Sequence, residues 1–229
     1  MKITDAHTHL TKISDCDIVI YNSATPDDWG RIVNMVAESG GRAHGAIGVH
    51  PWCVSDLSQN WYCTLKKILS ENPDLLIGEI GIDKHHPNIL LQQDVFVLQL
   101  QLAHELQRGV SVHCVGAWDK VLGILKMCRN ALPPFILFHS YSGPVLEIEK
   151  LAQQYNAYFS YGVRSLNSPE RILHTPQNRI LIETDESDIS VSEILYSMSE
   201  ILSVAPEKMS DIIYENIIRM LSHAQITQN

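Results

Sequence analysis

The stretch Ile3-Thr4-Asp5-Ala6-His7-Thr8-His9 places a His-x-His pair at the end of a short, mostly apolar run. In a β-strand, the side chains of residues i and i+2 point to the same face, so His7 and His9 would lie side by side. Two imidazoles on one face can bind a single divalent ion. The stretch therefore predicts a first strand that ends in part of a metal site.

The same order, an apolar run followed by a metal-binding side chain, recurs along the chain. Carboxylates in such positions are costly to bury unless they are paired or bind metal. The runs 75–78, 110–112, 135–138 and 180–184 lead to Glu79, His113, His139 and Asp185. Together with the first pair, they predict one metal centre with six ligands: His7, His9, Glu79, His113, His139 and Asp185.

Apolar runs alternate with helix-like stretches over the whole chain. The runs lack polar alternation, as strands covered on both faces do. Eight strands that alternate with helices predict a TIM-like (β/α)8 barrel, in which catalytic residues gather at the carboxyl ends of different strands. This fold would bring the six candidate ligands into one bowl. The expected strands cover residues 2–8, 17–22, 44–49, 75–80, 109–114, 134–139, 157–161 and 179–185.

One connection is too short for a regular barrel. Only residues 10–16 separate the first two expected strands, whereas a parallel crossover usually needs a dozen or more residues. Either the first helix is missing and the barrel is distorted or shortened there, or the second strand is misassigned.

Helix signals fill the other connections. Thr25-Pro26-Asp27-Asp28 and Ser190-Val191-Ser192-Glu193 are typical helix starts, with a capping residue followed three positions later by an acid. A closing helix is expected over residues 206–221. The helix after Pro87 is expected to bury a face formed by Val95, Leu98, Leu102 and Leu106.

The composition is that of a globular protein, and we expect a single domain over residues 1–229. Hydrophobic residues make up 45% and charged residues 19% of the chain. The formal net charge is −9 without a Lys/Arg run, which argues against extended DNA binding but not against a site whose metals supply positive charge. Five cysteines without a CxxC pair indicate free thiols in a cytoplasmic protein. No apolar run is long enough to span a membrane, and the first residues do not fit a signal peptide.

Three or four histidines with two carboxylates exceed the needs of one tetrahedral site. Two ions bridged by a carboxylate would use them all, and such ions lie about 3.5–4 Å apart and lower the pKa of a bound water. The mixed nitrogen and oxygen ligands suit Zn, Mg or Mn in different degrees. On this interpretation Glu79 lies between an ion held by His7, His9 and Asp185 and an ion held by His113 and His139.

These residues also carry a family resemblance. The chain resembles the TatD family of metal-dependent hydrolases, which are similar to amidohydrolases in fold. The similarity runs almost end to end and keeps the order of the motifs. The matching stretches are DAHTHL (5–10), GAIGVHP (45–51), IGEIGID (77–83), QLQLA (99–103), VHC (112–114), HSYSG (139–143), YFS (158–160), ILIETD (180–185) and NIIRML (216–221).

The resemblance implies a distorted TIM barrel, two divalent metals and phosphodiester hydrolysis. Family members are typically described as deoxyribonucleases, often 3′→5′ exonucleases, so the expected partner is a single-stranded DNA end or a small phosphoester. The resemblance also implies that Asp185 positions or deprotonates the attacking water. The resemblance further implies that one metal is bound by His7, His9, Glu79 and Asp185, and the other by Glu79, His113 and His139.

The chain departs from the family pattern around the expected substrate. The segment after the first strand is short, and Val115 stands where an Arg commonly follows the His-Cys pair. Asp185 leads through residues 186–188 straight into a helix, where the family usually has a Pro-containing loop. Two extra carboxylates in that segment would repel phosphate. Since the ligands are intact, hydrolysis is better supported than DNA as the substrate.

Candidate substrate contacts and alternative functions remain open at this point. Lys12, Lys84 and Arg164 follow expected strand ends and could hold a phosphate, and His50 could line the bowl. A lactonase- or amidase-like hydrolase of small metabolites is one alternative, although amidohydrolases often carry a carboxylated Lys where this chain has Glu79. A non-catalytic barrel that binds a metal or a partner is the other. The sequence gives no indication of the oligomeric state.

Overall fold

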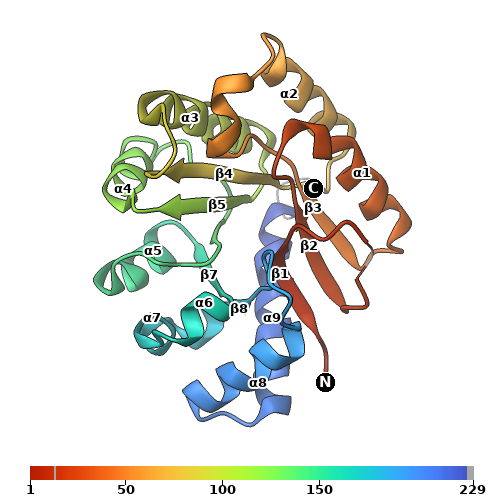
Figure 1. The fold of residues 1–229 in the computed structure, drawn as a ribbon, viewed down its shortest axis with the longest axis vertical. Helices are drawn as coiled ribbons and strands as arrows, with labels where there is room; N and C mark the ends of the chain where they lie inside the picture. The colour runs from red at the N-terminus through yellow and green to blue at the C-terminus, as the bar shows by residue number, and fades with distance from the viewer. Residues whose placement is uncertain (13, 226–229) are drawn as a thin grey trace.

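Eight parallel strands form the centre of the molecule (Figure 1). A computed structural model of the chain describes residues 1–12 and 14–225. Each predicted run overlaps one strand, including the second run. The strands are β1 (Thr4–Thr8), β2 (Ile18–Asn22), β3 (Ala43–Ala46), β4 (Ile77–Asp83), β5 (Val110–Val115), β6 (Ile136–Phe138), β7 (Ala157–Tyr161) and β8 (Ile180–Ile182).

Backbone hydrogen bonds divide these strands into two sheets that meet at two seams. One sheet has the order β1-β2-β3 and the other the order β4-β5-β6-β7-β8. Single bridges join them, between Thr8 and Asp185 at one seam and between Ala46 and Leu76 at the other. The strands thus close into the predicted TIM-like barrel. Backbone hydrogen bonds cross both seams, such as Leu76 N to Gly45 O at 2.8 Å and Asp185 N to His7 O at 2.9 Å.

The short connection between β1 and β2 is the distorted part of the barrel. The two strands pair directly in parallel, and the described parts of their connection, residues 9–12 and 14–17, contain no helix. The hydroxyl of Tyr21 holds this connection in place, because it accepts from the Ser14 amide at 2.7 Å and donates to the Lys12 carbonyl at 3.2 Å. The first helix is therefore missing, and the second strand was assigned correctly.

Helices surround the strands on the outside (Figure 1). The two predicted capping sequences are confirmed: Asp28 Oδ2 accepts from the Thr25 amide at 3.0 Å, and Glu193 Oε2 accepts from the Ser190 amide at 3.0 Å. The α-helices are α1 (Trp29–Glu38), α2 (Trp61–Glu71), α3 (Ile89–Leu106), α4 (Trp118–Met127), α5 (Ile148–Gln154), α6 (Val163–Leu166), α7 (Glu170–His174), α8 (Val191–Leu202) and α9 (Pro206–Gln225), with 3-10 turns η1 (Pro26–Asp28), η2 (Pro51–Asp56), η3 (Val145–Glu147) and η4 (Gln177–Arg179).

The buried face of α3 differs from the predicted one. Val95 and Leu102 are buried as expected, but Leu98 is 41% exposed, and Phe96 and Gln99 are buried in addition. The prediction was wrong at Leu98 because the apolar residues of α3 are spread around nearly its whole circumference. Their spacing alone therefore does not select one face.

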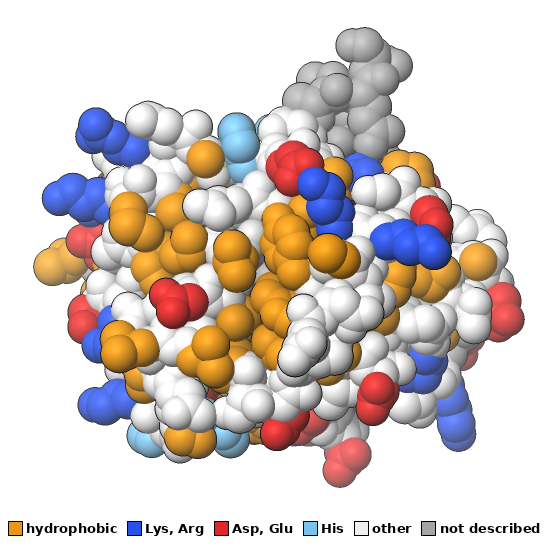
Figure 2. All heavy atoms as spheres, turned by 90° about the horizontal axis from the view of Figure 1, so that it is seen from above, with side chains coloured by type: hydrophobic (Ala, Val, Ile, Leu, Met, Phe, Trp, Pro, Cys, Tyr) orange, Lys and Arg blue, Asp and Glu red, His pale blue; other side chains and the backbone are white. Residues whose placement is uncertain are grey.

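Charged side chains of both signs are interspersed on the side of the molecule where α1, α2 and α3 lie (Figure 2). This side shows no stripe of Lys and Arg in the described part of the chain. None of the described helices is long and apolar enough to cross a membrane. On this side the described residues therefore offer no extended phosphate-binding surface.

Candidate metal centre

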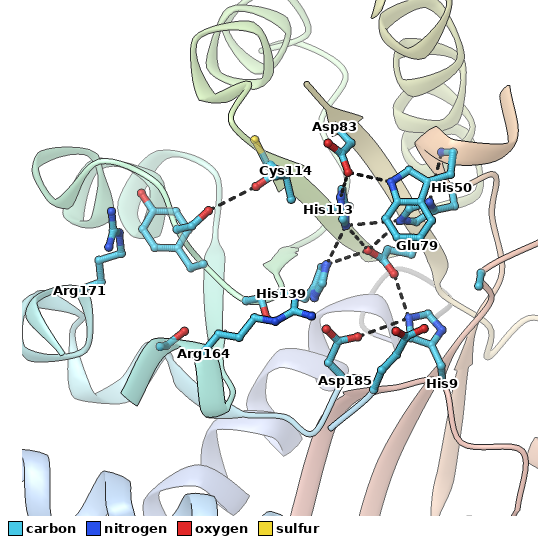
Figure 3. Close-up of a pocket in the computed structure, with 18 of the residues that line it drawn as sticks. His9, His50, Glu79, Asp83, His113, Cys114, His139, Arg164, Arg171 and Asp185 are labelled. Carbon is cyan, nitrogen blue, oxygen red and sulfur yellow. Dashed lines mark hydrogen bonds and ion pairs between the residues drawn. The ribbon is translucent and has the colours of Figure 1, made fainter. Parts of the chain in front are cut away.

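All six predicted ligands meet at one end of the barrel, and Figure 3 labels all of them except His7. They come from β1, β4 and β5 and from the segments just after β1, β6 and β8. His7 and Glu79 are 0% and 2% exposed, whereas His9 and Asp185 are only partly buried. The cluster thus has a closed floor and one side that is open to solvent.

The carboxylate of Glu79 lies at the centre of this cluster, with its two oxygens facing different imidazoles. Oε2 lies 3.3 Å from His7 Nε2 and 3.1 Å from His9 Nε2. Oε1 lies 2.6 Å from His113 Nδ1 and 2.7 Å from His139 Nε2. One carboxylate therefore joins two separate groups of donor atoms.

The first group has the spacing of ligands around a single ion. His7 Nε2 and His9 Nε2 are 3.2 Å apart, and Asp185 Oδ1 lies 4.0 and 3.7 Å from them. Donors about 2.1 Å from a common ion are roughly 3.0–3.4 Å from their neighbours in octahedral or tetrahedral geometry. Three atoms of this group, including Glu79 Oε2, already match these distances, and Asp185 lies slightly farther away.

The second group is more compact, because its two imidazole nitrogens lie 2.6 and 2.7 Å from Glu79 Oε1, closer than the ligands of one ion. His113 Nδ1 and His139 Nε2 are 3.2 Å apart, and both lie against Glu79 Oε1. A third imidazole nitrogen, His50 Nε2, lies 3.4 Å from both Glu79 Oε1 and His113 Nδ1. Spacing alone would admit His50 as a ligand.

Each imidazole has a second ring nitrogen that faces away from Glu79. The hydrogen-bond partner of this nitrogen shows whether the histidine can bind a metal or only donate a hydrogen bond. His9 Nδ1 lies 2.9 Å from the Asn22 carbonyl, which can only accept, so His9 Nε2 keeps its lone pair for a metal. His50 Nδ1 instead accepts from the Trp52 backbone amide at 3.2 Å. Its Nε2 therefore carries the proton, and His50 is a hydrogen-bond donor to the cluster and not a metal ligand.

A carboxylate lies beside the second ring nitrogen of His113, through a hydrogen bond, and of His139, as an ion pair. Asp83 Oδ2 lies 3.4 Å from His113 Nε2, and Glu183 Oε1 lies 3.5 Å from His139 Nδ1. A carboxylate beside one ring nitrogen holds the proton there and leaves the other nitrogen, which faces Glu79, free to bind metal. The tautomers of His9 and His113 and the spacing of the first group therefore fit metal ions.

The charges of the cluster favour a cation. Burial works against ionisation of Glu79, but positive charge on His139 and His7 holds the pKa of this carboxyl well below its usual range. Burial likewise opposes a charged His139, yet Glu79 and Glu183 raise the pKa of this imidazole well above its usual value. A site that stabilises extra protons on its imidazoles also stabilises a divalent ion, which would displace those protons.

Asp83 and Glu183 were missed as members of the site. A usable signal existed for both: Asp83 shares the strand face of Glu79, four residues on, and Glu183 stands two residues before Asp185. Glu183 is completely buried and accepts from the hydroxyls of Ser140 and Ser160. Both carboxylates therefore lie beside the ring nitrogen of a ligand histidine that faces away from Glu79.

Other supporting groups had no clear signal in the sequence. The Ser111 hydroxyl lies 3.1 Å from His7 Nδ1. Asp5 accepts from the hydroxyl of Thr184 at 2.6 Å, which ties β1 to the segment after β8, and its burial raises the pKa of this carboxyl to about 7. Such contacts join segments far apart in the chain, so only the folded structure reveals them.

Two backbone positions allow the strands to meet at the cluster. Gly81 has a φ of +150°, and a Cβ there would collide with the His113 carbonyl, so only glycine lets β4 and β5 approach this closely. Asp185 adopts a left-handed conformation with a φ of 54°. Its amide donates to the His7 carbonyl at 2.9 Å, which keeps the carboxylate beside the first group.

A cavity of about 580 Å³ opens in front of the donor atoms. Of the four predicted substrate contacts, His50 and Arg164 line it, and Figure 3 shows Arg164 reaching toward His139 and Asp185. The sequence had not indicated the other side chains that complete its wall. They include Trp52, Tyr141, Ser142 and Arg171.

Lys12 and Lys84 are not among the described residues that line this cavity. Lys12 lies exposed on the connection after β1, and the exposed Lys84 has its aliphatic chain near Gly116. Their position after strand ends had suggested phosphate contacts. A strand end sets where the backbone points, but the side chains of both lysines lie outside the bowl.

Sequence comparisons place these residues in a known context. A family model described as "TatD related DNase" matches residues 4–222. The chain is 28% identical over 149 residues to the uncharacterised metal-dependent hydrolase YabD of Bacillus subtilis, and 32% identical over 156 residues to the 3′-5′ ssDNA/RNA exonuclease TatD of Erwinia billingiae. These matches cover 62% and 63% of the chain. They span 58% of the length of each relative.

A comparison of folds agrees with this result. The crystal structure of YjjV, a TatD homologue from Escherichia coli, superimposes with a TM-score of 0.84. The match covers 95% of this chain and 97% of that one at 19% sequence identity. The likeness at this level of identity establishes the TIM-like fold.

Proposed function

Because the chain belongs to the TatD-related DNase family, we propose that it is a metal-dependent hydrolase that removes nucleotides from the 3′ end of single-stranded DNA. The observation that carries this proposal is the position of Glu79, whose two carboxylate oxygens face two separate groups of imidazoles. A carboxylate shared in this way is suited to bridge two ions. Relatives named as nucleases and metal-dependent hydrolases support the same reaction class.

The ligand assignment follows the two groups of donors. When bound, two divalent ions would lower the pKa of a water and neutralise charge on the phosphoryl group. Zn, Mg and Mn all accept such mixed nitrogen and oxygen donors. We assign His7, His9, Glu79 and Asp185 to one ion, and Glu79, His113 and His139 to the other.

Three further side chains have roles that their positions support. Asp185 is only partly buried and faces the cavity, so its carboxylate can orient the attacking water and accept a proton from it. His50 presents a protonated Nε2 toward Glu79 Oε1, so it can hold this carboxylate in place at the wall of the cavity. The Arg164 guanidinium reaches toward the ligands and can bind a non-bridging phosphate oxygen.

The proposal is tested with chelator-treated protein that is reloaded with Mg, Mn or Zn. A single-stranded DNA labelled at its 5′ end is expected to shorten one nucleotide at a time, because cleavage starts at the 3′ end. Asp185→Asn is expected to lose at least about 100-fold in rate, the usual contribution of a general base. Glu186→Gln, its neighbour on the cavity wall, is the matched control and should retain turnover.

No release of nucleotides with any of these metals would overturn the nuclease proposal. Shortening from the 5′ end would overturn the direction alone. A panel of esters and lactones, run with the same preparations, would show whether the site hydrolyses a different bond.

A small phosphoester is the second candidate substrate. The cavity of about 580 Å³ has the size of a small-molecule site, and Arg164 and Arg171 are the Lys and Arg side chains among its described lining residues. Two guanidinium groups can neutralise one or two phosphates but not a long DNA backbone. Faster hydrolysis of a mononucleotide ester than of a DNA end would favour this candidate.

A further inference from the structure

Trp52 is a large aromatic side chain that stays half exposed at the edge of the proposed metal centre. It belongs to η2 and is 54% exposed, although most large aromatic side chains of this protein are buried. Its indole lines the same cavity as the donor atoms. Exposure of this kind beside an active site is typical of a surface that binds a ligand.

The indole is held in a fixed orientation. Its Nε1 donates to Asp83 Oδ2 at 2.7 Å, and Asp83 also holds His113. The ring of His86 stacks on it with centroids 4.4 Å apart and an interplanar angle of 19°. The edge of the ring also meets His50, at a centroid distance of 4.8 Å. A rigid ring loses little conformational entropy when a ligand binds to it.

The indole lies between the cavity and a covering imidazole. His86 stacks on one face of Trp52 and is not among the described residues that line the cavity, whereas Trp52 itself lines it. The centroids of Trp52 and His113 are 6.3 Å apart, so the indole lies next to the proposed ligands. A flat group bound there would adjoin a phosphate bound at the metal centre.

The charges around the cavity agree with a flat, uncharged group beside the indole. Arg164 approaches the ligands from the side of His139 and Asp185 (Figure 3). Trp52 instead bonds to Asp83 and lies beside His50 and His113. Phosphate and aromatic contacts are therefore separated across the metal centre. A nucleotide has the same separation between its phosphate and its base.

We propose that Trp52 is the surface on which the terminal base of a single-stranded DNA substrate stacks, with His86 as the second layer of the stack. This inference rests on the proposed function and adds the residue that recognises the end of the strand. Stacking is tolerant of sequence because every base has a π-face. A base must be unpaired to enter the cavity, so the enzyme would select single strands over blunt duplexes.

The test uses a single-stranded DNA whose last linkage is a phosphorothioate, which resists cleavage, and whose 3′-terminal base is 2-aminopurine. Stacking quenches the fluorescence of this base. We expect quenching with the wild-type protein and with Trp52→Phe, which keeps an aromatic face but loses the N–H to Asp83. Trp52→Leu should give none. Trp61→Phe, on α2 outside the cavity, is the matched control and should behave as wild type.

A second strand that lacks only the terminal base gives an independent measurement. Loss of the base should weaken binding to the wild-type protein about 5- to 100-fold, the range of base–aromatic stacking. With Trp52→Leu the two strands should differ by less than about 2-fold, because the interaction partner is already gone. In turnover experiments, Trp52→Leu should raise KM more than it lowers kcat.

Equal affinity of the wild-type protein for the two strands would overturn the stacking inference, even if Trp52→Leu does not fold. Quenching by Trp52→Leu equal to wild type would also overturn it. In both cases continued cleavage of DNA ends would leave the proposed function intact. Absence of both cleavage and binding would instead show that the proposed function itself has failed.

Discussion

The floor of the metal centre and its rim differ in how firmly their side chains are held. The floor consists of the six proposed ligands, and the second ring nitrogens of His7, His9 and His113 have hydrogen-bond partners on other strands. The rim consists of Trp52, Val115, Arg164, Arg171 and Glu186, which line the cavity. Of these, Trp52 and Arg171 each have one side-chain hydrogen-bond partner, Asp83 and the Gly143 carbonyl. The departures from the family pattern at Val115 and Glu186 lie on the rim. The comparison indicates that the reaction is fixed by the floor, while the substrate can change with the rim.

The largest effect is expected at the centre of the floor. Glu79→Gln removes the charge that faces both groups of imidazoles, and turnover should fall at least about 10³-fold, since residues that merely support a ligand already contribute about 10- to 100-fold. Nucleotide release and metal content by mass spectrometry would be measured together. If the Glu79→Gln variant keeps activity within tenfold of wild type, the floor does not control the reaction more strongly than the rim does.

The next effect concerns stability and its dependence on pH. Burial opposes the charge of Glu183, but the His139 imidazole and the Ser140 hydroxyl hold the pKa of this carboxyl at about 2. A carboxyl whose pKa is lowered by folding stabilises the protein above its unfolded pKa of about 4.3, and this contribution disappears as the pH falls from about 4 to 2.

Glu183→Gln should therefore lower the free energy of unfolding of the metal-free protein by about 3 kcal/mol at pH 7 and by much less at pH 2. Urea unfolding at both pH values measures the difference. Glu193→Gln, in the exposed capping box of α8, is the control and should leave the unfolding free energy almost unchanged, because Gln also completes such a box. An equal loss at both pH values would argue against a charged Glu183.

A smaller effect is expected just behind the floor. Asp83→Asn leaves the proposed ligands in place but removes the carboxylate that orients His113, so metal affinity should fall about 10- to 100-fold. Competition with a fluorescent chelator would measure it, and excess metal should restore most of the activity. Asp119→Asn, on the surface of α4, is the control. Unchanged affinity would mean that Asp83 acts only through Trp52.

The smallest effect is expected on the rim. Arg164→Ala should raise KM about 10-fold with kcat nearly unchanged, because it removes binding that the ground state and the transition state share. Steady-state kinetics on a single-stranded DNA end would show this, and Arg129→Ala on the surface is the matched control. A fall in kcat of similar size would assign Arg164 to the floor.

Local patterns in the sequence were sufficient for much of the fold. The eight apolar runs and the capping sequences at Thr25 and Ser190 depend on neighbours along the chain, and all of them were found. The buried face of α3 was predicted less well, because Leu98 is as apolar as its buried neighbours. The roles of Lys12 and Lys84 were inferred from strand ends, but side-chain direction is not fixed by the position of a strand end.

By itself the sequence determined the barrel and the six candidate ligands, because apolar runs and the alternation of side chains on a strand are local properties. Only the tertiary structure decided that Glu79 faces two groups of imidazoles, that His50 donates instead of binding metal, and that Trp52 forms a wall of the cavity. Each of these depends on atoms brought together from distant parts of the chain. Spacing in the sequence does not encode which nitrogen meets which oxygen across a closed barrel.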